Sequence, residues 1–154
     1  MSKIELGKKA PSFTLEGTSG AWASKEAAGS TLVIYFYPKD NTTGCTQEGQ
    51  DFAALHTQFK KMKAVIVGIS PDSVASHEKF KAKMGFPFDL LADPDQKVCN
   101  LFEVYKEKSM YGRKYMGVER STFVIDDKGV LRHEWRKVKV KGHAEAVLAA
   151  VKSL

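Results

Sequence analysis

Two apolar segments separated by an amphipathic one constrain the fold of this chain more than any other feature. Residues 31–37 are β-branched, aromatic or aliphatic and stop at Pro38, a pattern typical of a fully buried strand. Residues 64–70 form a second such run. Between them, apolar side chains at helical spacing predict a helix over about residues 45–61: Phe52, Leu55, Phe59 and Met62. A strand–helix–strand unit of this length implies parallel strands and a right-handed crossover.

The segments around this unit continue the alternation of strands and helices. Residues 7–20 are expected to form an extended segment and a turn along the edge of the main sheet. Residues 70–85 begin with helix-opening residues and end at a glycine, which predicts a second helix. Residues 88–92 are a short strand candidate. A further helix is predicted to open at Asp93, with an inner face made of Val98, Leu101, Phe102 and Tyr105.

The last third of the chain predicts a hairpin and a closing helix. Residues 121–126 and 130–135 flank a turn of the Asp-Lys-Gly type, and residues 142–154 carry apolar side chains on one helical face. The order β-α-β, inserted helices and β-β-α matches the thioredoxin fold. We therefore predict an α/β fold with a central mixed sheet flanked by helices, an N-terminal extension and an insertion before the C-terminal hairpin. No repeat or linker divides the chain, so residues 1–154 are expected to form a single domain.

The charge pattern favours a solvated basic surface over nucleic-acid binding. The net charge of +6 comes from 24 basic and 18 acidic residues. Cations and tyrosines are interleaved over residues 105–115, but no recognisable RNA-binding motif accompanies them. The densest basic run, residues 136–141, alternates charged with apolar side chains, as an exposed strand would. A basic surface of this kind would also attract acidic partner proteins or anionic substrates with low specificity.

Targeting and metal-binding signals are missing from the sequence. Residues 1–7 contain no apolar signal-peptide core, and no segment approaches the ~18 apolar residues of a membrane span. A cytoplasmic location without membrane association is therefore expected. Two cysteines are too few for a disulfide scaffold. The histidines lack metal-ligand spacing, so we expect neither a metal nor a cofactor: His56, His77, His133 and His143.

Cys45 lies where the first buried strand gives way to the helix. Unpaired N–H groups and the positive end of the helix dipole stabilise an anion there, and the thiolate is the nucleophilic form of cysteine. Pro38 adds a rigid apolar ring, the Thr42 hydroxyl is close enough to bond the thiolate or a bound oxygen, and Gly44 lets the backbone turn tightly. Each residue has a structural alternative: turn former, helix cap or inert thiol. Together they favour chemistry at Cys45.

The same residues carry a family resemblance. The run Phe-Tyr-Pro-Lys-Asp, followed by Thr42 and Gly44-Cys45-Thr46, resembles the peroxidatic motif of peroxiredoxins, Pro-x-x-x-Thr-x-x-Cys. It is most similar to the bacterioferritin-comigratory (Q-type) branch, and residues 106–117 and 119–126 fit this branch too. The resemblance spans nearly the whole chain. It implies a thiol-dependent peroxidase, an antioxidant oxidoreductase that reduces hydrogen peroxide and organic hydroperoxides.

The resemblance also implies a role for each matching residue. Cys45 would attack a peroxide oxygen and become a sulfenic acid. Thr42 and the Cys45 backbone N–H would hold the peroxide. Arg120 would stabilise the thiolate and the charge that moves onto the leaving oxygen. Glu48 would orient Arg120, a role that we weigh equally with that of a helix-dipole partner. Pro38 and Gly44 would shape the site around these groups.

The chain departs from the Q-type pattern at the resolving cysteine. The two usual positions are occupied here by Gln50 and Lys81, which leaves only Cys99. Cys99 borders the apolar face of its predicted helix, where a free cysteine usually behaves as a small hydrophobe. We therefore prefer a one-cysteine cycle, while Cys99 as a resolving thiol stays open. Thioredoxin, glutaredoxin or a small thiol would reduce the Cys45 sulfenic acid directly.

Two other functions compete with this interpretation. A disulfide oxidoreductase normally needs Cys-x-x-Cys, and the run Gly44-Cys45-Thr46-Gln47-Glu48 lacks the second cysteine. A redox sensor that relays oxidation of Cys45 to a partner protein is the main alternative. Repeated turnover separates the two, because a sensor is oxidised without rapid recycling. We expect a monomer whose partners are a hydroperoxide and a thiol reductant, with neither nucleic acid nor membrane.

Overall fold

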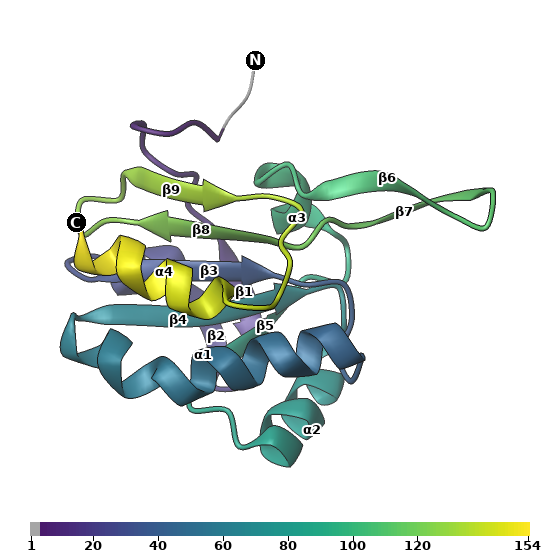
Figure 1. Cartoon of the computed structure of the whole chain (residues 1–154), viewed down its shortest axis with the longest axis horizontal. Coiled ribbons are helices and arrows are strands. Elements are labelled where there is room, and N and C mark those ends of the chain that lie inside the picture. Colours follow the sequence, from purple (N-terminus) through teal and green to yellow (C-terminus); the bar gives the residue numbers. More distant parts are fainter. Residues whose placement is uncertain (1–3) are drawn as a thin grey trace.

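A seven-stranded mixed sheet forms the centre of this computed structural model, which describes residues 4–154 (Figure 1). The strand order is β2-β1-β5-β4-β3-β8-β9. Three central strands run parallel to one another: β3 (Thr31–Phe36), β4 (Ala64–Ser70) and β5 (Asp89–Ala92). The flanking strands are antiparallel to their neighbours: β1 (Thr14–Gly17), β2 (Gly20–Ala23), β8 (Ser121–Ile125) and β9 (Leu131–Trp135). The sequence predicts no signal-peptide core in residues 1–7. Of these, residues 1–3 lie outside the described residues.

The helices cover the two faces of the sheet. One face carries three helices: α1 (Thr43–Lys61), α2 (Val74–Met84) and α4 (His143–Lys152). The other is covered by α3 (Lys97–Leu101) and the N-terminal segment, which includes the short 3-10 helix η1 (Ser24–Ala27). Alternate residues of β3 point to opposite faces, so Tyr35 packs under α1 while Ile34 packs on the α3 side. The interior is therefore divided into two hydrophobic clusters by the sheet.

Most of the predicted elements are confirmed. The N-terminal extension forms the β1–β2 hairpin at the sheet edge, where β1 pairs with β5. The second helix, the C-terminal hairpin and the closing helix also lie where the apolar patterns predict them. Within the described part of the chain, each helix is too short or too polar to cross a membrane.

The helix predicted to contain Tyr105 is shorter than expected. α3 ends at Leu101, and Tyr105 lies in a strand instead. The helix stops because Glu103 adopts left-handed backbone geometry (φ 59°), and the N–H of Val104 donates to the carbonyl oxygen of Cys99 at 2.9 Å. A backbone turn of this kind leaves no trace in the spacing of apolar residues.

The basic run at residues 136–141 is a loop, so its prediction as an exposed strand is wrong. β9 ends at Trp135, and Lys137 has a left-handed φ of 51°, which interrupts extended backbone. The Arg136 guanidinium donates to the carbonyl oxygen of Glu103 at 2.8 Å. The alternation of charged and apolar residues here does not arise from strand geometry.

The insertion before the C-terminal hairpin holds a second hairpin, whereas only helices were predicted there. β6 (Tyr105–Met110) and β7 (Arg113–Val118) pair with each other in a separate two-stranded sheet. They project from the body of the molecule (Figure 1). Tyr111 and Gly112 make the turn, with φ values of 52° and 78°. Such tight turns usually contain asparagine or aspartate before the glycine, which explains why the sequence pattern was missed.

The loop that joins β3 to α1 is held by Asp40, which is buried. Its Oδ1 accepts a hydrogen bond from the Tyr37 hydroxyl at 2.7 Å. Its Oδ2 accepts from the Ser76 hydroxyl and lies 2.7 Å from Nδ1 of His77. The backbone N–H of Asp40 donates to Asp72 at 2.9 Å. These bonds tie the loop to the start of α2.

His77 is the buried partner of this carboxylate. Its Nε2 lies 2.9 Å from the carbonyl oxygen of Leu91, which can only accept, so Nε2 carries a hydrogen. Its Nδ1 faces Oδ2 of Asp40 at 2.7 Å, so both ring nitrogens have a partner inside the protein. Asp40, Asp72 and His77 also offer possible metal ligands within 4.8 Å of one another, a grouping that their sequence spacing did not reveal. Because these groups already hydrogen-bond within the protein, we assign them to anchoring the loop.

Replacing Asp40 should destabilise the fold in a pH-dependent way. Asp40→Asn is expected to lower the free energy of unfolding by about 3 kcal/mol at pH 7, because it leaves buried His77 without its charged partner. Burial by itself would raise the pKa of Asp40, but hydrogen bonds from His77, Tyr37 and Ser76 hold that pKa below its ordinary value. The carboxylate therefore stabilises the fold above the unfolded pKa of about 3.9, and the contribution is lost as pH falls through the lower folded pKa.

Urea denaturation of both proteins between pH 7 and pH 3 measures this difference. The gap between wild type and variant should be constant above about pH 5 and shrink toward pH 3. A gap that is absent at pH 7, or independent of pH, would contradict the assigned anchoring role.

Candidate active site

Cys45 is the third residue of α1 and is almost completely buried, with 1% of its surface exposed. The first α-helical backbone bond runs from the N–H of Thr46 to the carbonyl oxygen of Thr42. Among the described residues, the N–H groups of Thr43, Gly44 and Cys45 therefore find no acceptor. The thiol lies at a helix start that presents free donors to an anion, as predicted.

The sheet brings Arg120 to this thiol. In the antiparallel pairing of β3 with β8, Phe36 lies opposite Ser121. The residues that follow β3 and precede β8 therefore meet at one end of the sheet. The Nη2 of Arg120 donates to Cys45 Sγ at 3.3 Å, and Nη1 donates to Glu48 Oε1 at 2.6 Å. One guanidinium thus bridges two groups that lie one turn apart on α1.

The charges of the three groups depend on one another. Burial would lower the pKa of Arg120, but Glu48 and Cys45 raise it above its ordinary value, so the guanidinium stays charged. Burial raises the pKa of Glu48 to about 7, although Arg120 pulls in the opposite direction. Glu48 Oε2 has no hydrogen-bond partner among the described residues. Near neutral pH, Glu48 therefore neutralises Arg120 only in part, and positive charge remains available to the thiol.

Gly44 does not make the turn that was predicted for it. It is part of α1, and the turn before the helix is made by Asn41, which has the left-handed φ of 65°. A Cβ atom at Gly44 would lie 3.1 Å from Nη2 of Arg120. The guanidinium thus passes close to the helix backbone at a residue that has no side chain.

Thr42 and Pro38 lie in the loop that precedes α1. Thr42 is exposed and is the N-cap residue of α1, but its hydroxyl donates to the carbonyl oxygen of Lys39 at 2.9 Å and makes no capping bond. The helix-cap alternative for its side chain is therefore not seen. Pro38 is half-buried and directly follows the buried Tyr37.

Cys99 lies on the other face of the sheet. It is fully buried in the α3 cluster, whereas Cys45 belongs to the cluster under α1. Burial, with the nearby Asp93 carboxylate, raises the pKa of the Cys99 thiol far above its ordinary value. Both cysteines are free thiols. The usual resolving positions contact other groups: Gln50 meets Met84 Sδ at 3.7 Å, and Lys81 pairs with Asp89 at 3.0 Å.

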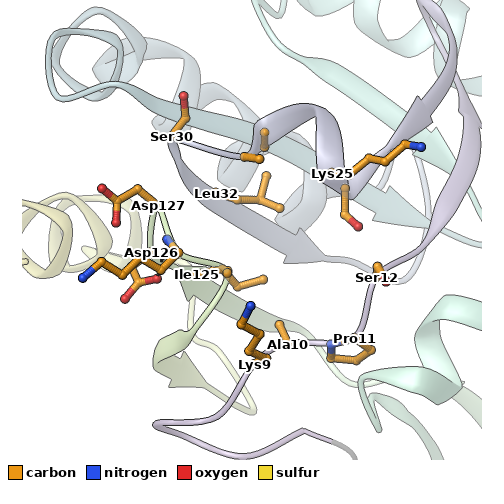
Figure 2. Close-up of a pocket in the computed structure, with 15 residues that line it drawn as sticks. Lys9, Ala10, Pro11, Ser12, Lys25, Ser30, Leu32, Ile125, Asp126 and Asp127 are labelled. Atoms are coloured by element: carbon orange, nitrogen blue, oxygen red, sulfur yellow. Dashed lines mark hydrogen bonds between the residues drawn. The ribbon is translucent and has the colours of Figure 1, made fainter.

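A pocket at the far end of the sheet does not belong to this site. Figure 2 shows it between the start of β3 and the end of β8, with Leu32 and Ile125 on its floor and Asp127 on its rim. Cys45 follows the opposite end of β3. This cavity therefore does not contain the thiol.

Some residues of the site could not have been found in the sequence. The side chains that anchor the loop between β3 and α1 come from that loop itself and from the start of α2: Tyr37, Asp40, Asp72, Ser76 and His77. Lys108 of β6 was noted only for its charge, yet the charges of Arg120 and Cys45 influence its pKa. Only the position of Asp40 inside the motif offered a signal.

Comparison with known proteins agrees with this geometry. The family model described as AhpC/TSA matches residues 6–134. Peroxiredoxin Bcp of Xanthomonas campestris pv. campestris is 57% identical over 126 residues, which cover 82% of this chain and 79% of the relative. Peroxiredoxin Bcp of Bacillus subtilis is 48% identical over 152 residues, which cover 98% of this chain and 97% of the relative.

Solved structures show the same relationship. Peroxiredoxin Q of Xanthomonas campestris superposes with a TM-score of 0.88 at 52% identity, covering 92% of this chain and 90% of its own. A cysteine-to-serine mutant of PrxQ from Xylella fastidiosa gives a TM-score of 0.93 at 40% identity, with coverage of 99% and 98%. Another similar structure concerns the alkyl peroxide reduction activity of the Xanthomonas campestris bacterioferritin comigratory protein. The chain therefore belongs to the AhpC/TSA family as a peroxiredoxin of the Bcp (PrxQ) group, and it is a thiol-dependent peroxidase.

Proposed function

We propose that Cys45 is the nucleophile of this peroxidase and that Arg120 activates it. The supporting observation is the guanidinium that contacts Cys45 Sγ at 3.3 Å and Glu48 Oε1 at 2.6 Å. A charged guanidinium beside the sulfur stabilises the negative charge that develops on the reacting atoms. Glu48 then acts as a positioning residue, because it reaches the reaction only through Arg120.

The oxidative step is a nucleophilic displacement at oxygen. The Cys45 thiolate attacks one oxygen of ROOH, an S–O bond forms as the O–O bond breaks, and the leaving RO⁻ takes up a proton to depart as water or an alcohol. Arg120 stabilises the negative charge as it moves from sulfur to the leaving oxygen. The Thr42 hydroxyl and the free Cys45 N–H hold the peroxide, and Pro38 limits access of water.

The reductive steps use a thiol from outside the chain. A thiol attacks the Cys45 sulfenic acid, which forms a mixed disulfide and releases water, and a second thiol frees Cys45 as a disulfide leaves. The sheet between Cys45 and Cys99 supports this one-cysteine cycle, because disulfide formation needs Cα atoms within about 7 Å. Thioredoxin, glutaredoxin and small thiols are the candidate reductants. We further propose that residues 1–154 act as a single domain, as a monomer, in the cytoplasm, where free thiols persist.

Loss of the Cys45 sulfur should abolish the reaction. Cys45→Ser is expected to consume no hydrogen peroxide with dithiothreitol as reductant. Cys99→Ala is the matched control and should keep wild-type turnover, because its thiol lies on the other face of the sheet. Mass spectrometry after one equivalent of peroxide should find a Cys45 sulfenic acid or its adduct. Retained activity in Cys45→Ser, or a Cys45–Cys99 disulfide, would refute the corresponding part of the proposal.

Adding a methyl group at Gly44 should slow the peroxide step without lowering the stability of the fold. Gly44→Ala places a Cβ atom 3.1 Å from Nη2 of Arg120 and should displace the guanidinium. The peroxide step is expected to slow about tenfold or more, because small misplacements of a catalytic group are costly. The free energy of unfolding should stay level or rise by up to about 1 kcal/mol, since alanine is the better helix former. Stopped-flow oxidation and urea denaturation test the two effects, and an unchanged rate would rule out this steric role.

Glu48 should affect both the rate and the pH dependence of stability. Glu48→Gln keeps an acceptor for Arg120 and should retain the rate within about threefold, whereas Glu48→Ala should lose about tenfold or more. Burial raises the pKa of Glu48 to about 7, so folding takes up a proton and wild-type stability falls between about pH 4.5 and pH 7. The free energy of unfolding should fall by about 3 kcal/mol over this pH range in the wild type and should not change with it in Glu48→Gln. Equal rates in the two variants would exclude the positioning role.

A further inference from the structure

The β6–β7 hairpin has no structural role in the main sheet. Its two strands pair over six residue pairs with each other and with no other described strand. At about 3.3 Å per residue, the hairpin is about 20 Å long. Two-stranded hairpins are at best marginally stable alone, so a projecting hairpin of this length needs another explanation.

The two faces of the hairpin differ in charge. The register places one set of side chains on the same face, here called the cationic face: Lys106, Lys108, Met110, Arg113 and Tyr115. Within residues 4–154, the three cations of this face form no ion pair. On the opposite face, Lys114 pairs with Glu107 at 3.6 Å. Unpaired positive charge is therefore confined to one side of the hairpin.

The cationic face leads to the reactive thiol. β7 ends at Val118, two residues before Arg120, and the hairpin leaves the body at the end of the sheet where β3 gives way to α1 (Figure 1). The stem of Lys108 lies across Gly117, where a Cβ atom would be 3.2 Å from its Cδ. Burial lowers the pKa of Lys108, and Arg120 lowers it further, while Cys45 and Glu119 act in the opposite direction. The ammonium of Lys108 is thus within electrostatic range of the site.

Exposed apolar side chains also gather on this hairpin. Seven large hydrophobic residues are exposed in the described part of the chain, and four of them belong to the hairpin: Met110, Tyr111, Tyr115 and Met116. Tyr111, at the tip, is 99% exposed. Tyrosine, methionine and arginine are enriched in protein interfaces. A hairpin that combines them with unpaired cations has the composition of a docking surface.

We propose that the cationic face of the β6–β7 hairpin docks an acidic dithiol protein, which reduces the oxidised Cys45. The inference rests on the proposed one-cysteine cycle, in which the electrons come from another molecule. A small hydroperoxide is far shorter than a face of about 20 Å and needs only the groups beside Cys45. A protein surface of negative charge complements the three cations and is steered toward the thiol.

The chemistry of the docked complex balances without a further reactant. One thiol of the partner attacks the Cys45 sulfenic acid, forms an intermolecular disulfide and releases water. The second thiol of the partner attacks the partner's own sulfur in that disulfide. Cys45 leaves as a thiol, and the partner leaves as an intramolecular disulfide.

Charge reversal on the hairpin tests this surface. The variant Lys106→Glu/Arg113→Glu avoids Lys108, whose pKa responds to the charges of Arg120 and Cys45. Its matched control, Lys60→Glu/Lys61→Glu, changes the net charge equally at the far end of α1, about 23 Å from Cys45. The probes are a reduced thioredoxin of net negative charge and, as the small reductant, dithiothreitol.

The hairpin variant should lose about tenfold in kcat/KM for the thioredoxin at low ionic strength, mainly through KM. The loss should shrink at 0.5 M salt, where the screening length is only about 4 Å. Turnover with dithiothreitol and the peroxide step should stay within about twofold of wild type, as should all rates of the control. Tyr111→Ser, which changes no charge, should weaken the same thioredoxin reaction at both salt concentrations.

Other outcomes would overturn the docking surface. These are an unchanged thioredoxin reaction in the hairpin variant, an equal loss with dithiothreitol, and an equal loss in the control. If the variant instead loses binding to RNA or to anionic vesicles while its thioredoxin kinetics stay intact, the face belongs to that other partner. Wild-type enzyme that consumes no peroxide with dithiothreitol would refute the proposed function itself, and this result is distinct from all of the others.

Discussion

The Arg120 guanidinium is the group around which the site is built, because it joins the only two polar groups that α1 buries beside it. Cys45 and Glu48 lie one turn apart on that helix, and both contact the guanidinium. A buried cation is stable only where anions or acceptors meet it. Gly44 leaves room for the approach. Because burial raises the pKa of Glu48 to about 7, its carboxylate is only partly ionised near neutral pH. The positive charge of Arg120 is therefore not fully neutralised by Glu48 and acts on the thiol.

The central sheet decides which groups can take part. It places the end of β3 beside the start of β8, which brings Arg120 to the helix start. It also separates the two thiols, since Cys45 and Cys99 belong to clusters on opposite faces. A reductant must therefore approach from outside. The projecting hairpin leaves the body at the end of the sheet where β3 gives way to α1, the helix that begins with Cys45 in its first turn (Figure 1).

Much of the fold could be predicted because it follows from local patterns. The parallel unit, the C-terminal hairpin and the closing helix each show a clear local pattern. The pattern is a continuous apolar run for the buried strands and apolar residues at helical spacing for the helices. The failures have backbone causes. Left-handed residues at Glu103 and Lys137 ended a predicted helix and interrupted a predicted strand. The β6–β7 hairpin escaped prediction because most side chains on both of its faces are exposed and its turn is Tyr111-Gly112. Alternation carries no information where neither face of a strand is buried.

The sequence by itself determined the chemistry of the reactive residue and its position at a helix start, because both depend on neighbours within a few residues. The sequence also placed Glu48 in the first turn of that helix, while its pairing with Arg120 was implied only by the family resemblance. Only the tertiary structure decided the contacts across 37 residues from Asp40 to His77 and across 75 from Cys45 to Arg120. It also decided that the guanidinium passes close to Gly44 and that Cys45 and Cys99 lie on opposite faces of the sheet. Such relations depend on strand order and on the face to which each side chain points, and neither can be read from local sequence.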